Sequence, residues 1–297
     1  MTLINRLPTR TWNRLGVNET ALSWDENGTT EMSPLTVDVT GRKKVVRVEV
    51  NGENEFSRKK VTINAQSETS VTVIEVLSTE NNLAVETELN VKENALVRLI
   101  QVQRSEEKSL VYNKVTSFCD ESGRVELLQV FPGKGDIYSD SLIELTGDKS
   151  SFKSDIGYLG QREQTVDINL VVNHYGKSTE SEINASGALK DSSSKIFRGT
   201  IDFKTGSSDS VGNEKESVLM LGDGVINKTV PLILCAEENV VGNHGATIGE
   251  LDDETLFYFE SRGIGKAEAE NILARAAIER LARETGDEET EKLIIKI

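Results

Sequence analysis

The residues best suited to metal or nucleophile chemistry are scarce in this chain of 297 residues, which has two histidines and two cysteines. Cys119 and Cys235 are too few for a disulfide scaffold or a four-cysteine zinc site. His174 and His244 argue against a multi-histidine metal site that one chain completes alone. A Cys–His nucleophile pair stays open by count, although no local signature supports it.

Phosphate-binding and hydrolase motifs are absent from the sequence. The stretches Gly133–Gly135 and Gly263–Lys266 lack the G-x-x-x-x-G-K-[ST] spacing that wraps a phosphate in backbone N–H groups. No G-x-G-x-x-G follows a strand-like segment, and there is no G-x-S-x-G nucleophile turn. Carboxylates are abundant enough to supply the paired acids of a glycosidase, yet no pair stands out.

The chain is acidic, with 34 Lys and Arg against 49 Asp and Glu and a net charge of −15. Nucleic acids and anionic membrane surfaces select basic proteins, so neither is an expected partner. Residues Met1 to Gly16 lack the apolar core of a secretion signal, and the longest apolar run, near Val230–Ala236, is too short to span a bilayer. We therefore expect a cytoplasmic protein of a reducing compartment.

Apolar and polar residues alternate from about Val37 to His244, as in Val46–Val50 and Val61–Ala65. Such alternation is typical of β-strands. An acid or amide followed by valine also recurs at the ends of strand-like segments, at spacings of 26, 26 and 28 residues. These pairs are Glu49-Val50, Glu75-Val76, Gln101-Val102 and Gln129-Val130.

A period in the twenties with two strands per period is typical of a solenoid, in which each turn bonds to the next. An antiparallel sandwich is the alternative. It would show more tight hairpin signals than Asn27-Gly28 and Asn51-Gly52, the only two Asn-Gly pairs. The repeat therefore favours an all-β core that is built as a parallel β-helix.

The composition turns helical after Leu251. Acids at Asp252–Glu254 mark a helix start, and Gly263 can end that helix. A second helix is predicted from about Lys266 to Glu284, whereas Glu288–Ile297 is either helix or an added strand. The second helix has apolar residues every four positions, at Ala269, Leu273, Ala277 and Leu281. The predicted domains are a short N-terminal segment (1–30), the β-helix core (31–245) and a C-terminal helical domain (246–297).

The least generic segment, His244–Ile264, reads HGATIGxLDxxxLFYxxSRGI. It resembles the C-terminal part of the SufB/SufD family of iron–sulfur cluster assembly proteins, in a SufD-like short form. Three other stretches resemble the same family: Leu7–Asn18 (LPTRTWNRLGVN), His174–Ser181 (HYGKSTES) and Phe197–Gly222, with its FRG and ESVLMLG. Between about 20 and 165 only the strand pattern agrees.

The resemblance implies a right-handed parallel β-helix followed by a small C-terminal α-helical domain. It implies a non-catalytic scaffold subunit that binds no ATP, within a SufBCD-type complex. The implied partners are a SufC-type ABC ATPase that docks on the C-terminal helices, a SufB-type protein or a second copy of this chain, and indirectly a cysteine desulfurase. A transient iron–sulfur cluster is expected at or near the interface between the two β-helix chains.

His244 matches the histidine that the family places at this interface, and the resemblance makes it the first candidate cluster ligand. A neutral imidazole binds iron, and a partner chain can complete the ligand set. The alternative is a hydrogen-bonded histidine that caps the last turn.

Other candidate ligands are weaker. Gly242 stands where many SufD-type sequences have cysteine. Cys235 is a second candidate, but it lies in the apolar segment Leu232–Ala236, where a cysteine is usually a small buried hydrophobe. Glu216 stands near the position of the SufB-type scaffold cysteine, which favours a SufD-like role.

Candidate ATPase-docking residues follow His244 in the same segment. Arg262 is the most informative, because arginine beside aromatic residues suits an interface anchor. The alternative is that the apolar members, with Phe259, only bury their helix against the end of the β-helix. Both can hold, since a helix can bury one face and offer the other. The candidates are Leu256, Phe257, Tyr258, Ser261, Arg262 and Gly263.

Two other classes of function remain open. The first is a carbohydrate-acting β-helix enzyme, which would usually carry a secretion signal and a groove of charged catalytic residues. The second is a metal-free β-helix interaction protein. For His174 a structural position at a strand end or turn is favoured, and Cys119 lies outside any motif.

Overall fold

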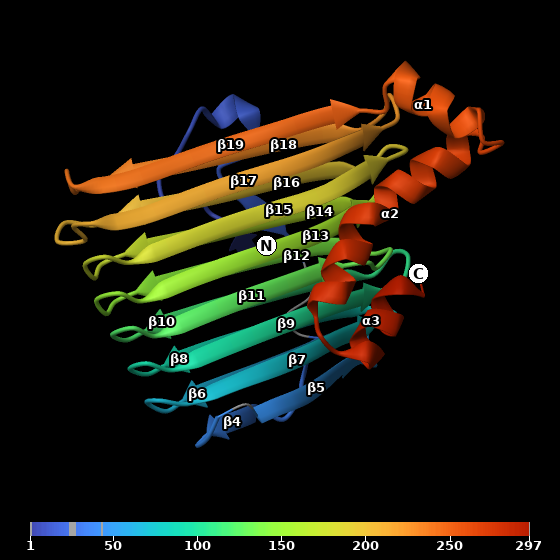
Figure 1. Ribbon diagram of the computed structural model, residues 1–297. Coiled ribbons are helices and arrows are strands. Elements are labelled where there is room, and N and C mark those ends of the chain that lie inside the picture. Colours follow the sequence, from blue (N-terminus) through green and yellow to red (C-terminus); the bar gives the residue numbers. More distant parts are fainter. Residues whose placement is uncertain (1, 24–27, 43, 297) are drawn as a thin grey trace.

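Successive strands alternate between two parallel sheets, which face each other as the walls of a β-solenoid (Figure 1). The structure is a computed structural model that describes residues 2–23, 28–42 and 44–296, with only the backbone at Ala277. Sheet 1 contains β3 (Thr30–Glu31), β4 (Leu35–Val39), β6 (Phe56–Ala65), β8 (Asn82–Val91), β10 (Leu110–Cys119), β12 (Asp136–Leu145), β14 (Thr165–His174), β16 (Ser194–Phe203) and β18 (Ile226–Cys235). Sheet 2 contains β5 (Lys44–Gly52), β7 (Ser70–Thr79), β9 (Leu96–Ser105), β11 (Arg124–Phe131), β13 (Ser151–Gly160), β15 (Glu180–Lys190), β17 (Ser210–Leu221) and β19 (Val240–Glu250).

The register confirms the parallel solenoid and most of the sequence repeat. Glu75 pairs with Gln101, and Gln101 pairs with Gln129, at the predicted separations of 26 and 28 residues. Glu49 was wrongly grouped with them, because Val48 is the residue that pairs with Glu75. Since strand side chains alternate between the two faces, this offset of one residue puts Glu49 on the exposed face.

Residues with left-handed backbone recur at the corners where the chain passes from sheet 1 to sheet 2. Their backbone N–H groups bond to the corner of the next turn, as in Asn94 N to Glu121 O (3.0 Å) and Ser122 N to Asp148 O (2.8 Å). This bonding offsets a conformational cost of about 1–2 kcal/mol for a non-glycine residue. The corner residues are Glu68, Asn94, Ser122, Lys149, Ser178 and Asp209.

The space between the sheets is mostly filled by valine, leucine and isoleucine, but one inward column is polar. Gln101 Nε2 donates a hydrogen bond to Glu75 Oε2 (2.7 Å), and Gln129 Nε2 donates to Gln101 Oε1 (2.9 Å). Across the interior, Thr87 Oγ1 donates to the Glu75 carboxylate at 3.1 and 3.2 Å. Glu75 is thus a fully buried carboxyl without a cationic partner among the described residues.

The C-terminal helices cover part of the outer face of sheet 2 (Figure 1). They are α1 (Asp253–Glu260), α2 (Lys266–Glu284) and α3 (Glu288–Ile295). The inner side of α2 meets an apolar strip of the sheet. A Cβ on Gly157 would lie 2.6 Å from Leu281 Cδ1, so the end of the Leu281 side chain packs directly on this glycine. The buried helix residues are Ala269, Ala274, Ile278, Leu281, Ala282, Thr290 and Ile294.

The helix predictions are largely confirmed. Helix α2 has the predicted bounds, and Asp252 caps α1 through Oδ1, which accepts from Thr255 N at 2.7 Å. Of the predicted apolar face, Ala269 and Leu281 are buried and Leu273 is half-buried, whereas the Ala277 side chain lies outside the described residues. Strand β19 continues to Glu250, so the expected start of the helical domain at 246 falls inside a strand.

Among the described residues, no helix is both long and apolar enough to cross a membrane.

The N-terminal segment lies against the outer face of sheet 1. It forms an antiparallel pair of short strands, β1 (Thr2–Ile4) and β2 (Thr20–Leu22), joined through the 3-10 helix η1 (Asn13–Leu15). Ile4 and Leu22 cover the outward aromatic rings of Tyr112 and Tyr138.

Replacing Glu75 with glutamine should stabilise the fold above neutral pH. Burial raises the pKa of Glu75 from 4.5 to about 7. The contribution of Glu75 to the free energy of unfolding should therefore fall as the pH rises from about 4.5 to about 7, and this loss should then stay constant. At about pH 8, Glu75→Gln should raise that free energy by about 3 kcal/mol, as measured by urea denaturation.

The matched control is Glu93→Gln, which removes an exposed carboxyl from a turn and should change neither stability nor its pH dependence. An identical pH dependence in wild type and Glu75→Gln would contradict a buried carboxyl that ionises near neutral pH.

Candidate functional site

The last turn of the solenoid is open. Strands β18 and β19 pair on one side only, with β16 and β17, and they form one end of each sheet (Figure 1). Their free edges leave backbone N–H and C=O groups available for another chain. No described residue of β18 or β19 is buried, because no further turn covers them.

His244 lies on β19 at this open end. It pairs in register with Glu214, which pairs with Ile183, so all three side chains belong to one inward column. His244 is nevertheless exposed, and it borders a hollow of about 510 Å³ that Glu214 also lines. The imidazole makes no side-chain hydrogen bond with the described residues, which goes against the alternative of a hydrogen-bonded cap.

Two carboxylates lie directly beneath this turn, Glu214 and Glu216, both buried. Glu216 forms an ion pair with Lys195, accepts from the Tyr158 hydroxyl at 3.2 Å and accepts from Thr229 Oγ1 at 2.6 Å. Burial is the main cause that lowers the pKa of Lys195, and the adjacent Glu216 opposes it. This part of the solenoid interior is therefore a paired, fully enclosed ionic cluster.

Glu214 is in a different state. Its Oε2 has no hydrogen-bond partner among the described residues. Burial, and secondarily the charge of Glu216, raise the pKa of Glu214 to about 8, although Lys195 acts in the opposite direction. At neutral pH Glu214 is thus mostly a protonated carboxyl next to an exposed imidazole, and both can become ligands of a cation that displaces the proton.

A single chain does not complete a metal site here. Across residues 2–23, 28–42 and 44–296, no group of three or more His, Cys, Asp or Glu side chains is arranged to hold a metal ion. His244 and Glu214 could supply two ligands, and any others must come from elsewhere.

The cysteines differ from what their sequence context indicated. Cys235 was expected to be buried in an apolar strand, but it is exposed at the end of β18, where its Sγ donates to Glu237 O at 3.5 Å. The cause is its place in the final turn, which leaves the strand uncovered. Cys119 is buried in the core, and burial raises the pKa of its thiol to about 12.

The structural interpretation of His174 is confirmed. Its ring is fully buried against Phe203, with 4.7 Å between ring centroids. Nδ1 and Nε2 are hydrogen-bonded to the hydroxyls of Thr179 (2.7 Å) and Ser181 (2.9 Å). Burial lowers the pKa of His174 to about 4, so the ring stays neutral.

The predicted docking residues lie on α1 and directly after it, beside the open end (Figure 1). No residue of α1 is buried, and Phe257 and Tyr258 are 71% and 54% exposed. The Arg262 guanidinium lies 3.8 Å from the centroid of the Tyr258 ring. Burial against the β-helix therefore does not explain Phe257, although Leu256 is half-buried. Ser261 Oγ donates to Tyr258 O at 2.8 Å, and Gly263 has a left-handed φ of 79°.

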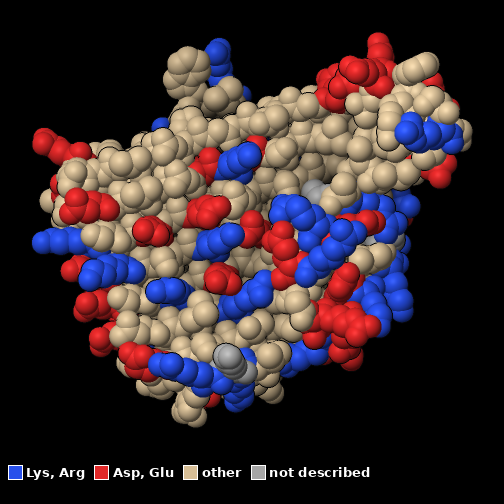
Figure 2. Space-filling view, viewed as in Figure 1, with Lys and Arg blue, Asp and Glu red and all other residues tan. Residues whose placement is uncertain are grey.

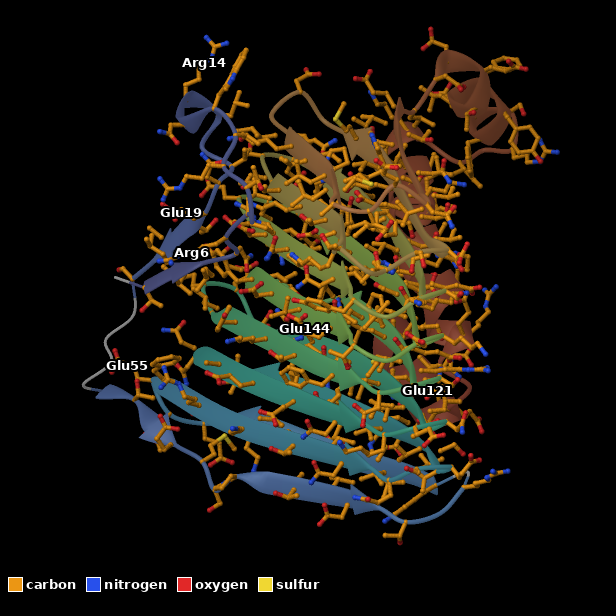
Figure 3. All side chains as sticks on the ribbon, turned by 90° about the vertical axis from the view of Figure 1, so that its left-hand side faces the viewer. Arg6, Arg14, Glu19, Glu55, Glu121 and Glu144 are labelled. Carbon is orange, nitrogen blue, oxygen red and sulfur yellow. The ribbon has the colours of Figure 1, made fainter. Side chains whose placement is uncertain are left out.

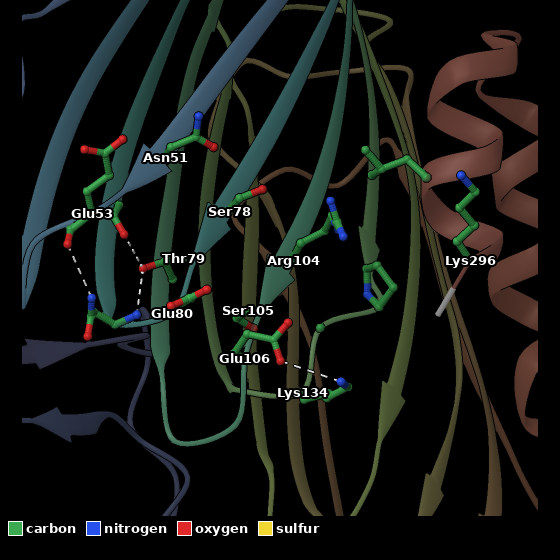
Figure 4. Close-up of a pocket in the computed structure, with 15 residues that line it drawn as sticks. Asn51, Glu53, Ser78, Thr79, Glu80, Arg104, Ser105, Glu106, Lys134 and Lys296 are labelled. Atoms are coloured by element: carbon green, nitrogen blue, oxygen red, sulfur yellow. Dashed lines mark hydrogen bonds and ion pairs between the residues drawn. The ribbon is translucent and has the colours of Figure 1, made fainter.

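A separate groove of about 580 Å³ lies between α3 and the strand ends of sheet 2 (Figure 4). Its lining includes Asn51, Ser78 and Arg104 from the strands, with Lys296 opposite them. Lys134 also lines the groove and forms an ion pair with Glu106, with 3.6 Å between Nζ and Oε2. None of the residues singled out for ligation or docking lies in it.

The sequence is similar to known proteins over most of its length. The family model described as "SUF system FeS cluster assembly, SufBD core domain" matches residues 48–277. The iron–sulfur cluster assembly protein SufD of Bacillus subtilis is 31% identical over 163 residues, which are 55% of this chain and 37% of the relative. An iron–sulfur cluster assembly SufBD family protein of Staphylococcus epidermidis is 27% identical over 244 residues, 79% of this chain and 52% of the relative.

The chain thus spans between about a third and a half of the length of these relatives. The family model nevertheless matches most of this chain, because residues 48–277 include the open end, α1 and most of the solenoid. The chain belongs to the SufB/SufD family of iron–sulfur cluster assembly proteins, in which it is SufD-like.

Proposed function

We propose that this chain is a non-catalytic, SufD-like subunit of a SufBCD-type complex, in which its open end meets a second β-helix chain. The observation that carries the proposal is the in-register pairing of exposed His244 with buried Glu214 at an edge that lacks its next turn. Glu214 Oε2 has no hydrogen-bond partner among the described residues. A second β-helix chain, either a SufB-type protein or another copy, would cover this edge and supply further ligands. The nascent iron–sulfur cluster is then a transient cargo of the interface.

His244 is the proposed cluster ligand of this chain, with Glu214 as its neighbour. Imidazole and carboxylate both suit iron. Cys235 is a weaker candidate. It is exposed in the same final turn, and its thiol would have to be deprotonated to bind iron.

The α1 patch, defined as Leu256, Phe257, Tyr258, Ser261, Arg262 and Gly263, is the proposed docking surface of a SufC-type ATPase. Two exposed aromatic rings with a stacked arginine have the composition of interface hot spots. Helix α2 follows α1 and packs on β13 and β15, so a force on the patch would reach sheet 2. ATP-driven dimerisation of two ATPase subunits could in this way open the interface at which the cluster forms.

The deciding experiment is co-purification with the SufC-type ATPase of the same source, with and without a SufB-type protein, followed by anaerobic reconstitution and assay of iron and sulfide. A stable complex that holds iron and sulfide supports the proposed function. A chain that binds neither protein and no iron would contradict it and leave a metal-free interaction protein.

His244→Ala should remove most of the iron that the reconstituted complex retains, and Glu214→Gln should lower it less, because glutamine keeps an oxygen donor. Asn243→Ala is the matched control, since Asn243 is the neighbour of His244 on the opposite face of β19. Iron content is measured per complex after desalting. Equal iron in wild type and His244→Ala would rule out the ligand assignment.

Arg262→Glu should weaken ATPase co-purification by about tenfold or more, because it replaces a stacked cation with an anion at the centre of the α1 patch. Arg124→Glu is the control: it reverses an exposed charge at the start of β11, away from the patch. The affinity is measured by titration with the purified ATPase. A variant that binds as tightly as wild type would show that the ATPase docks elsewhere.

A further inference from the structure

The loop between β1 and β2 is unusually well anchored for a surface segment. Beneath it lies an ion pair between Asp167 and Arg198, at most 1% exposed on either side chain. Arg198 Nε donates to Val17 O at 2.5 Å, and Asn5 Nδ2 donates to Asp167 Oδ1 at 2.7 Å. Thr20 Oγ1 also donates to the Asp167 carboxylate. Both ends of the loop are therefore fixed to sheet 1.

The loop is also closed on itself. The amide of Asn18 accepts from Thr11 N at 2.6 Å and donates to Thr11 O at 3.2 Å and to Asn13 Oδ1 at 3.0 Å. Gly16 ends η1 with a left-handed φ of 61°. Lys228, on β18 at the end of sheet 1, donates to Leu15 O at 3.0 Å. The N-terminal loop, residues 11–18, is thus a defined structure tied to the open end.

This loop presents a large apolar surface to solvent. Trp12 is 69% exposed and Leu15 is 47% exposed. The Arg14 guanidinium lies 5.0 Å from the centroid of the Trp12 ring and has no carboxylate partner among the described residues. Tryptophan and arginine dominate interface hot spots, and a rigid loop loses little conformational entropy on binding.

The loop stands beyond the last turn of the solenoid. In Figure 1 its dark blue trace rises past β19 on the side opposite α1, and in Figure 3 Arg14 lies above the strands. Figure 2 shows the same end with acidic side chains gathered over α1. Any chain that docks end-on against β18 and β19 must therefore pass between α1 and the N-terminal loop.

We propose that the N-terminal loop grips a second copy of this chain, docked end-on on β18 and β19. The free edges of β18 and β19 can pair with the same two edges of a second copy. In a symmetric dimer the loop of each copy then contacts the other copy, so the contact is made twice. Charge supports a second copy. The loop carries Arg14, which has no carboxylate partner among the described residues, whereas the same end presents acidic side chains at the half-buried Glu237, at the exposed Glu238 and along the exposed segment Asp252–Glu254. This inference rests on the proposed end-on pairing.

The test measures dimerisation of the full chain by sedimentation equilibrium. Trp12→Ala and Arg14→Ala should each weaken the dimer by about tenfold or more, since both replace hot-spot side chains. Ile248→Lys, which puts a charge on the exposed inner side of β19, should abolish the dimer. Phe118→Ala removes an aromatic side chain that is 43% exposed on β10, away from the open end, and should have no effect.

Fluorescence gives a second readout. In Trp24→Phe, Trp12 is the sole tryptophan of the chain, and its emission should shift to shorter wavelength as the dimer forms. A dimer that Ile248→Lys dissociates but Trp12→Ala leaves unchanged would overturn the role of the loop and leave end-on pairing intact. A chain that stays monomeric at all concentrations would overturn the second copy as partner, even if the chain then binds a SufB-type protein as the proposed function requires.

Discussion

Hydrogen bonding between successive turns is the constraint on which this structure depends. In a parallel solenoid each strand satisfies its backbone only through the turn before and the turn after it. The chain meets this requirement on both sides from β6 and β7 up to β16 and β17. Strands β18 and β19 pair on one side only, as do β3, β4 and β5 at the other end of the stack. The open end is a consequence of the fold itself. It is also where exposed His244 and Cys235 lie, next to the Glu214 carboxyl, whose Oε2 has no hydrogen-bond partner among the described residues.

The interior shows how the solenoid tolerates polar groups. Glu75 is held by the Gln101 amide and the Thr87 hydroxyl in the early turns, whereas Glu216 is held by Lys195 and Tyr158 in the late ones. A Cβ on Gly187 would lie 2.4 Å from the Tyr158 ring, so a glycine in the next turn makes room for that ring to reach the late cluster. Of the three interior carboxyls Glu75, Glu214 and Glu216, only Glu214 has an oxygen without a hydrogen-bond partner among the described residues, and it pairs in register with His244 at the open end.

The sequence predicts what is local or periodic and misses what depends on position in the stack. The bounds of helix α2 follow from its own apolar spacing. The pairing of Gln101 with Gln129 follows from the sequence period, because the strand register preserves that period. Glu214 and Glu216 are hidden because β17 is polar on both faces, so its alternation does not reveal which face is buried. Cys235 is misjudged because an apolar strand is buried only when another turn follows, and no local signal marks the last turn.

Strand β16 links the two sides of the open end. It carries Lys195, which is buried in the interior, and Arg198, which is buried under the N-terminal segment on the opposite face. Buried ion pairs seldom add net stability compared with apolar residues of the same volume, so these two are better explained by the geometry that they impose. Both cations fix the strand that supports β18, one from within the solenoid and one from outside. The final edge and the N-terminal loop are thereby held in one arrangement before any partner arrives, which lowers the entropy that binding must remove.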